Sequence, residues 1–376
     1  MSETTICCSA LALILLFAAP ADSQSIAVPI VPARQQWTLP LNNALTTAPG
    51  FNGVHGYFPI EGDRLVAYDL TSGRQLWLVP AQPGQPPVAS DEHVFVGPPN
   101  AIVALHATDG SEAWRTPIDE PLAVRPVWTS GWLIAATASG RVLALRAADG
   151  EIVWRHDTGT RVTATPAIGA DRVYVSLEDR RVLAVDVANG SVVWERRVGG
   201  PPTDILALED RIYVGATDNF LYSLDARRGT VAWRWRTGAD VIGAPVVDDD
   251  RVYFVALDNI LRALGRKGGS QAWKRPLPLR PRGGPLLVGT TLIVGGLAPA
   301  VRGYAAATGA PAGEVTLPSD LVAPPHAFVH DGVPMLVAVT SDIVNGATVM
   351  AFSPAVGLPG PFSPLPNQPT GPIPLP

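Results

Sequence analysis

Hydrophobic and polar residues alternate along most of the chain, in short runs separated by polar turns. Residues 173–195, VYVSLEDRRVLAVDVANGSVVWE, show this pattern most clearly. Two alternating runs flank a polar turn, and an Asn189-Gly190 turn then leads into a third run that ends at Trp194. Period-two alternation with β-branched residues predicts strands. Asn-Gly between two such runs predicts a tight hairpin, because both residues tolerate a positive φ.

The same unit returns at a fixed period. A glycine occupies the tight turn at Gly73, Gly110, Gly150, Gly190, Gly229, Gly269 and Gly309. A tryptophan follows six of these glycines, with spacings of 37, 40, 40, 39 and 40 residues, at Trp77, Trp114, Trp154, Trp194, Trp233 and Trp273. A period near 40 residues with about four strands per unit is typical of a β-propeller blade. A helical repeat would instead place apolar residues about 3.6 positions apart.

The two ends of the chain decide the number of blades. Trp37 lies 40 residues before Trp77 and has no blade of its own. Residues 335–354 supply two middle strands without the strand that carries a tryptophan, and Val315 lies in or next to the tryptophan slot of the unit before them. We expect the strand of Trp37 to complete the last blade, because closure removes exposed sheet edges. This predicts an all-β, eight-bladed propeller of four-stranded antiparallel blades, with seven blades as the alternative.

Composition supports a single ring with two appended ends. The chain has 376 residues, of which 36 are Gly and 38 are Pro, as expected for a β-protein with many tight turns. We predict a signal peptide at residues 1–21, a linker at 22–34, the propeller at 35–354 and a Pro-rich disordered tail at 355–376. A formal net charge of −5 argues against a nucleic-acid partner.

The N-terminal segment predicts export. An apolar run over residues 6–19 precedes the small-x-small sequence Ala19-Pro20-Ala21. Because Glu3 is present and Lys and Arg are absent ahead of this run, a retained membrane anchor stays open as an alternative. The only cysteines, Cys7 and Cys8, lie inside the segment, so the mature chain would have no disulfide, no thiolate metal site and no lipidated cysteine. We expect an exported protein, periplasmic or extracellular, with envelope association left open.

The tail that follows the propeller has a different composition. It is rich in proline and carries neither charge nor a repeat. Such a segment is typical of an extended spacer. Docking on a partner that recognises polyproline is the alternative.

The repeat resembles a known family. Residues 212–233, IYVGATDNFLYSLDARRGTVAW, form its clearest copy and resemble the pyrroloquinoline-quinone (PQQ)-like propeller repeat. That family includes eight-bladed quinoprotein dehydrogenases and the non-enzymatic BamB-like propeller of the outer-membrane β-barrel assembly machinery, to which this chain is closest in type. The resemblance covers about residues 36–354 and is specific for the fold, but fold does not fix function.

The resemblance also implies a role for the repeated tryptophans, which pack between neighbouring blades in this family. A large ring at one fixed position of every blade would fill the widening gap between sheets. We therefore assign Trp37, the six following tryptophans and the turn glycines to the structural blade motif. An aromatic cage for a ligand is the alternative, although cages need converging rings.

The quinoprotein branch of the family implies chemistry that the sequence does not obviously supply. The resemblance implies a calcium ion with oxygen ligands beside the quinone, a carboxylate base, an aromatic floor and a vicinal disulfide. Only Cys7 and Cys8 are vicinal, and we expect them to be removed. The positions just ahead of the innermost strands should point toward the ring axis. They hold one cation, one anion and otherwise mostly small residues: Arg125, Thr165, Asp204, Ala244, Gly284 and Pro324. We expect no catalytic, cofactor-binding or metal residues, with PQQ plus calcium as the alternative.

Three other groups of residues suggest chemistry less strongly than structure. His326 and His330 lie on a predicted strand, which would hold them about 13 Å apart, too far to share a metal ion. Residues 248–250, all aspartate, resemble a calcium-binding run but fill a hairpin turn. The pairs Arg227-Arg228 and Arg266-Lys267 occupy equivalent turns of adjacent units, either as a small basic patch on one rim or as solvated turns.

These observations predict a non-catalytic scaffold. We expect a monomeric, exported propeller that presents a rigid rim to protein partners in the cell envelope. The alternative is a quinone-dependent oxidoreductase or a small-ligand sensor that uses the central funnel.

Overall fold

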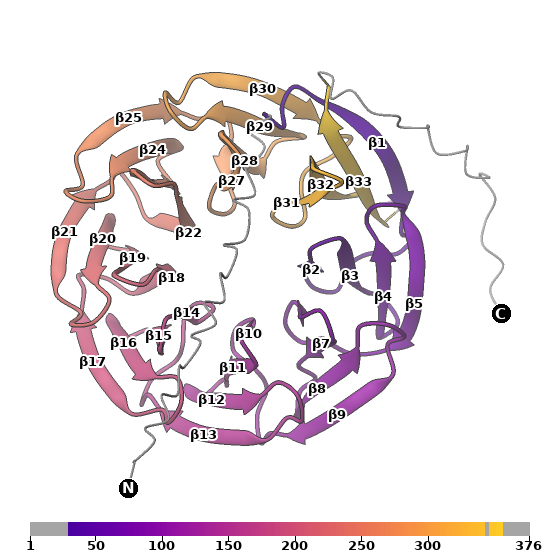
Figure 1. Cartoon of the computed structure of the whole chain (residues 1–376), viewed down its shortest axis with the longest axis horizontal. Helices are drawn as coiled ribbons and strands as arrows, with labels where there is room; N and C mark the ends of the chain where they lie inside the picture. The colour runs from indigo at the N-terminus through magenta and orange to yellow at the C-terminus, as the bar shows by residue number, and fades with distance from the viewer. Residues whose placement is uncertain (1–28, 343–345, 356–376) are drawn as a thin grey trace, which may run out of the picture.

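A computed structural model of the chain describes residues 29–342 and 346–355. These residues form a closed ring of eight antiparallel sheets around a central axis (Figure 1). The eight-bladed propeller is therefore confirmed, and the seven-bladed alternative is wrong. The predicted signal peptide and all but the first residue of the predicted tail lie outside the described residues. Within the described part of the chain, no helix is long and apolar enough to cross a membrane.

The blades follow one another in chain order. Blade 1 contains β2 (Gly50–Asn52), β3 (His55–Ile60), β4 (Arg64–Asp69) and β5 (Arg74–Pro80). Blade 2 contains β6 (Val88–Ala89), β7 (His93–Val96), β8 (Ala101–His106) and β9 (Glu112–Pro117). Blade 3 contains β10 (Val127–Thr129), β11 (Trp132–Ala136), β12 (Arg141–Arg146) and β13 (Ile152–Asp157). Blade 4 contains β14 (Ala167–Gly169), β15 (Arg172–Ser176), β16 (Arg181–Asp186) and β17 (Val192–Arg197).

The second half of the ring repeats this order. Blade 5 contains β18 (Pro202–Ala207), β19 (Arg211–Ala216), β20 (Phe220–Asp225) and β21 (Val231–Arg236). Blade 6 contains β22 (Val241–Val247), β23 (Arg251–Ala256), β24 (Ile260–Gly265) and β25 (Gln271–Pro276). Blade 7 has a divided inner strand and contains β26 (Arg280–Pro281), β27 (Leu286–Val288), β28 (Thr291–Leu297), β29 (Ala300–Ala305) and β30 (Pro311–Thr316). Blade 8 contains β31 (His326–His330), β32 (Val333–Asp342), β33 (Gly346–Pro354) and β1 (Ala33–Pro40).

The two faces of the ring carry different connections. Each outer strand leads to the next inner strand across one face, which we call the funnel face. On this face the connection forms an isolated β-bridge with the residue that follows the second strand of the blade it enters, as in Leu122 with Thr137 and Val162 with Leu177. The opposite face, which we call the turn face, carries the tight turns between the first and second and between the third and fourth strands. These two turns are also bonded, since the Ala226 N–H donates to the Asp210 carbonyl.

The N-terminal strand closes the ring, as predicted. β1 pairs with β33, and Trp37 lies opposite Ala351 in the register that Trp154 and Ala144 adopt in blade 3. The Gln36 side chain also donates to the Ser353 hydroxyl at 2.7 Å. Closure leaves every blade packed on two neighbours, because the alternating apolar residues of adjacent sheets share continuous cores.

The tryptophans of blades 1–6 all reach the next blade in the same way. Each indole N–H donates to a backbone carbonyl of the turn that begins the neighbouring outer strand, at 2.7–3.0 Å. Trp154, for example, donates to Val187 and lies against Gly190, where an added Cβ would be only 2.6 Å from the indole ring. The closing tryptophan differs, because the buried Trp37 N–H has no partner among the described residues. At its turn glycine, Gly73, an added Cβ would lie 3.9 Å from the ring.

Blade 7 has no tryptophan, and the N-terminal segment fills the space. Gly313, not Val315, occupies the tryptophan slot, since it lies opposite Gly303. Val31 is 1% exposed, and a Cβ added to Gly303 would lie 2.2 Å from its Cγ2 atom. Ile30 is also fully buried, and β1 begins at Ala33, so ordered packing starts ahead of the predicted boundary at residue 35.

Candidate functional site

The residues that the sequence placed near the axis lie at or just ahead of the inner strands of blades 3–8, with one correction to their position. Arg125, Thr165, Gly284 and Pro324 each lie two residues ahead of an inner strand. Asp204 and Ala244, which we expected in the same position, lie inside β18 and β22. The reason is that these two inner strands extend further toward the funnel face than those of the other blades. Each includes the expected position within an irregularity in its pairing with the next strand.

Two charged side chains lie in this ring of residues, and they do not pair with each other. Burial raises the pKa of the Asp204 carboxyl, and hydrogen bonds from backbone N–H groups, including that of Gly243, only partly offset this. Burial also lowers the pKa of the Arg125 guanidinium. The Arg125 Nε is buried and has no partner among the described residues. These six positions therefore hold one desolvated cation, on blade 3, and one desolvated acid, on blade 5.

Backbone packs against backbone where blades 6 and 7 meet at the funnel. An added Cβ at Gly243 would lie 1.8 Å from the Gly284 nitrogen, and one at Gly284 would lie 2.1 Å from the Ala244 carbonyl oxygen. Only glycine permits such an approach, so this part of the funnel wall cannot carry side chains at these positions. The wall is consequently formed by peptide groups at these positions.

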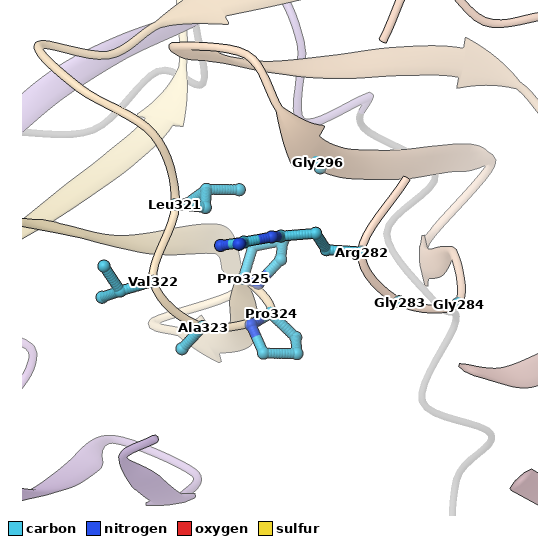
Figure 2. A pocket seen from close by; sticks show the side chains of 10 residues that line it. Arg282, Gly283, Gly284, Gly296, Leu321, Val322, Ala323, Pro324 and Pro325 are labelled. Atoms are coloured by element: carbon cyan, nitrogen blue, oxygen red, sulfur yellow. The ribbon is translucent and has the colours of Figure 1, made fainter. Parts of the chain in front are cut away.

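A cleft of about 140 Å³ opens between blades 7 and 8 beside this wall (Figure 2). One side is the Gly283-Gly284 connection with Gly295 and Gly296 of β28. The other side is the connection that precedes β31, with residues Leu321, Val322, Ala323, Pro324 and Pro325. The lining is apolar except for peptide groups and one charged side chain, Arg282.

Arg282 gives the cleft its chemical character. Its guanidinium extends over the cleft toward Leu321 and Pro325 (Figure 2). The side chain is exposed and forms no ion pair with any described residue. Val322, at the rim, is 39% exposed. The arrangement can accept a small apolar group and offer a hydrogen-bonding cation to an acceptor beside it.

The histidines predicted on one strand serve different contacts. His326 and His330 are the first and last residues of β31. The His326 ring stacks on Phe51 of blade 1 at 4.5 Å, and its Nε2 lies 2.8 Å from the Gly53 carbonyl oxygen. Burial lowers the pKa of His326, and the bond to Gly53 partly opposes this shift. His330 Nε2 instead lies 3.5 Å from an Asp331 carboxylate oxygen. His326 thus belongs to the joint between blades 8 and 1.

The three consecutive aspartates form the turn between β22 and β23. Asp248 accepts hydrogen bonds from the backbone N–H groups of Asp250 and Arg251 and from the Tyr253 hydroxyl. Burial raises the pKa of Asp248, but these hydrogen bonds outweigh burial and hold it below its ordinary value. The carboxylate is therefore used within the turn.

The residues of the funnel do not fit a calcium ion with a quinone. Within residues 29–342 and 346–355, no three His, Cys, Asp or Glu side chains lie close enough together to hold a metal ion. Asp204 is the single carboxylate in the ring of funnel residues, and it accepts hydrogen bonds from backbone groups. A calcium site needs six to eight oxygen ligands. We accordingly derive no reaction step through such a group.

Sequence reasoning missed the cleft. Its walls come from two connections, one before β27 and one before β31, together with two glycines of β28, and no period relates these segments. The Gly-Gly pair beside Arg282 was the one visible signal, because paired glycines mark a close approach of backbone.

Comparisons with known proteins agree with this architecture. The family model described as outer membrane protein assembly factor BamB matches residues 61–207 and 205–353. No curated protein matches the chain by sequence. The crystal structure of BamB from Moraxella catarrhalis is similar with a TM-score of 0.69 at 18% identity, covering 85% of this chain and 99% of that one. Quinohemoprotein alcohol dehydrogenase from Comamonas testosteroni is similar with a TM-score of 0.69 at 14% identity, covering 88% of this chain and 78% of that one. The computationally designed Ika8 protein has a TM-score of 0.70 at 14% identity, covering 85% and 99%. At these identities the solved structures establish the fold alone.

Proposed function

Because the chain belongs to the PQQ-like repeat family described as outer membrane protein assembly factor BamB, we propose that it is an exported, non-catalytic scaffold of the cell envelope. It binds protein partners through the funnel face. Family membership supports the class of protein, and the composition of the funnel supports a binding role over a catalytic one.

The observation that carries this proposal is the cleft between blades 7 and 8. Its apolar walls and the unpaired Arg282 match what a protein partner offers at the centre of an interface, an apolar anchor with a hydrogen-bond acceptor beside it. Arginine is enriched at such positions because its planar group keeps several donors available. The cleft is rigid on one side, since its wall is packed backbone.

Site-specific crosslinking in cells tests the proposal. A photoreactive residue at Val322 should yield a discrete crosslinked protein, while the same residue at Val153, which is 41% exposed on the outer strand of blade 3, should not. Arg282→Glu reverses the charge of the exposed arginine at the cleft and should abolish the crosslink from Val322 without unfolding the ring. A Val322 pattern identical to that of Val153, or one unchanged by Arg282→Glu, contradicts the proposal.

Titration calorimetry distinguishes the scaffold from the alternative, a quinone-dependent oxidoreductase or small-ligand sensor. Saturable binding of pyrroloquinoline quinone in the presence of calcium would overturn the scaffold proposal and make the funnel the site to mutate. An absence of heat from a protein shown to be folded would agree with a scaffold that carries no cofactor.

A further inference from the structure

Positive charge is concentrated on the outer edge of two adjacent blades. Residues 226–237 and 266–277 comprise the outer strands of blades 5 and 6 with the turns before them. Each segment contains four Lys or Arg residues and no carboxylate, so that 24 residues hold eight of the 28 cations of a chain whose net charge is −5. The equivalent segment of blade 3, residues 147–158, holds three carboxylates and one arginine.

Most of these cations are exposed, and the exposed Arg234 guanidinium also lies 4.8 Å from the centroid of the Phe220 ring on β20. β21 and β25 are neighbouring outermost strands of the ring (Figure 1). Six of the eight side chains are exposed, namely Arg227, Arg228, Arg234, Arg236, Lys267 and Lys274. The predicted basic patch at the two turns is thus the end of a larger surface that runs along both strands. We call these six residues the basic edge.

No member of the basic edge has an ionic partner among the described residues, whereas several cations on other blades do. Arg115 pairs with Glu112 on β9, Arg181 with Glu195 of β17, and Arg302 with Glu314 of β30. The two cations of these two segments that are not exposed bond to carbonyls instead: Arg266 to Asp248 and Arg275 to Gly309. The turns themselves also carry carboxylates, since Asp225 precedes Arg227 and the turns of Asp210 and Asp250 are bonded to those of Ala226 and Arg266. The excess of positive charge is therefore greatest along the strands, at Arg234, Arg236 and Lys274.

The backbone beside this charge is an open sheet edge. β21 pairs with β20 on its inner side and is the last strand of its sheet. Val231, at its start, is 45% exposed. Arg234 and Arg236 are two residues apart and project from the same face of the strand, about 7 Å from each other. An added strand would place its own alternate residues beside both arginines.

We propose that the basic edge binds an extended, acidic segment of a partner protein, which adds to β21 as a further strand. Main-chain hydrogen bonds would hold the segment, and carboxylates at alternate positions would meet Arg234 and Arg236. A flat anionic membrane fits less well, because the wall of a ring is convex and would touch a plane along little more than one blade. This surface lies on the circumference, so the inference goes beyond the funnel face and does not depend on it.

Fluorescence anisotropy with a labelled peptide of alternating Glu and Val tests this inference on the full chain. We expect saturable binding at about 50 mM salt that weakens strongly at about 300 mM, where charges are screened over a shorter distance. The variant Arg234→Glu with Arg236→Glu should bind at least about tenfold more weakly. Arg155→Glu is the matched control, because Arg155 follows its tryptophan on β13 as Arg234 does on β21, and it should change binding less than about twofold.

Two further probes separate the parts of the proposal. A peptide that is N-methylated at every peptide bond keeps its carboxylates but has no N–H group to donate from either edge, and it should lose binding. Binding that survives methylation overturns strand addition. An equal loss of binding in Arg155→Glu and in the double variant would show that the site is not on β21. Binding to phosphatidylglycerol vesicles without binding to the peptide would show that the basic edge binds a membrane and not a protein segment.

Discussion

The turn glycines allow a prediction in which one substitution is made at two equivalent places. Gly73 and Gly190 have φ values of 69° and 72°, so alanine meets the same backbone strain at both, about 1–2 kcal/mol. An added Cβ at Gly73 would lie 3.9 Å from the Trp37 ring, which is ordinary contact. At Gly190 it would lie 2.6 Å from the Trp154 ring, which is severe overlap.

The overlap sets the expected difference. Overpacking of a tight contact costs about 1–3 kcal/mol. Gly73→Ala should therefore destabilise the protein by about 1–2 kcal/mol, and Gly190→Ala by about 2–5 kcal/mol. Urea unfolding, monitored by circular dichroism, measures both losses. If the m values of the variants are equal, a shift in the midpoint reports a change in the free energy of unfolding alone.

A double variant identifies the cause. In a Trp154→Ala background the overlap disappears, so Gly190→Ala should cost no more than the strain that it shares with Gly73→Ala. If both alanines cost the same within about 0.5 kcal/mol in the parent, or if Gly190→Ala stays equally costly without the indole, the contact with tryptophan does not explain the glycine.

Three more outcomes are expected. Trp154→Phe should lower the free energy of unfolding, measured in urea, by about 1–3 kcal/mol more than Trp37→Phe. The substitution at Trp154 leaves the Val187 carbonyl without its donor, whereas the one at Trp37 removes an N–H that has no partner among the described residues. A chain that starts after Leu41 lacks β1 and should melt far below the longer chain; equal melting temperatures would contradict ring closure by this strand. Because the pKa of His326 is lowered in the folded protein, the unfolded chain binds a proton at this residue more readily. Stability should therefore fall as the pH drops below about 6.5, and the dependence of stability on pH should be weaker in His326→Gln. Thermal melts from pH 8 to about 5 measure both.

The architecture was predictable because its signals are local. Each Gly-turn-Trp unit specifies its own hairpin, and Trp37 lies one period ahead of Trp77, so blade number and closure followed from spacing. Blade 7 shows where local reading stops. Val315 looked like the substitute for a tryptophan, but the space is filled by Val31, which comes from the opposite end of the chain.

The binding features were less accessible for the same reason. The cleft depends on how the connection through Gly283 meets the one through Pro324, and no period relates the two. Asp204 and Ala244, which we expected just ahead of the inner strands, lie inside them because of pairing irregularities that composition does not encode. The basic turns were visible in the sequence, but their extension along β21 and β25 required knowing which strands are outermost.

Closure of the ring by β1 also has a consequence for the order of events during synthesis. The hydrogen bond from Gln36 to Ser353 joins residues 317 positions apart. At about 5–20 residues per second, the first strand must wait roughly 15–60 s before its partner β33 exists. During that interval the growing chain offers open strands at both ends, which are prone to pair wrongly. A polypeptide interrupted before β33 cannot finish the circle, so the joint between first and last strands distinguishes whole chains from fragments.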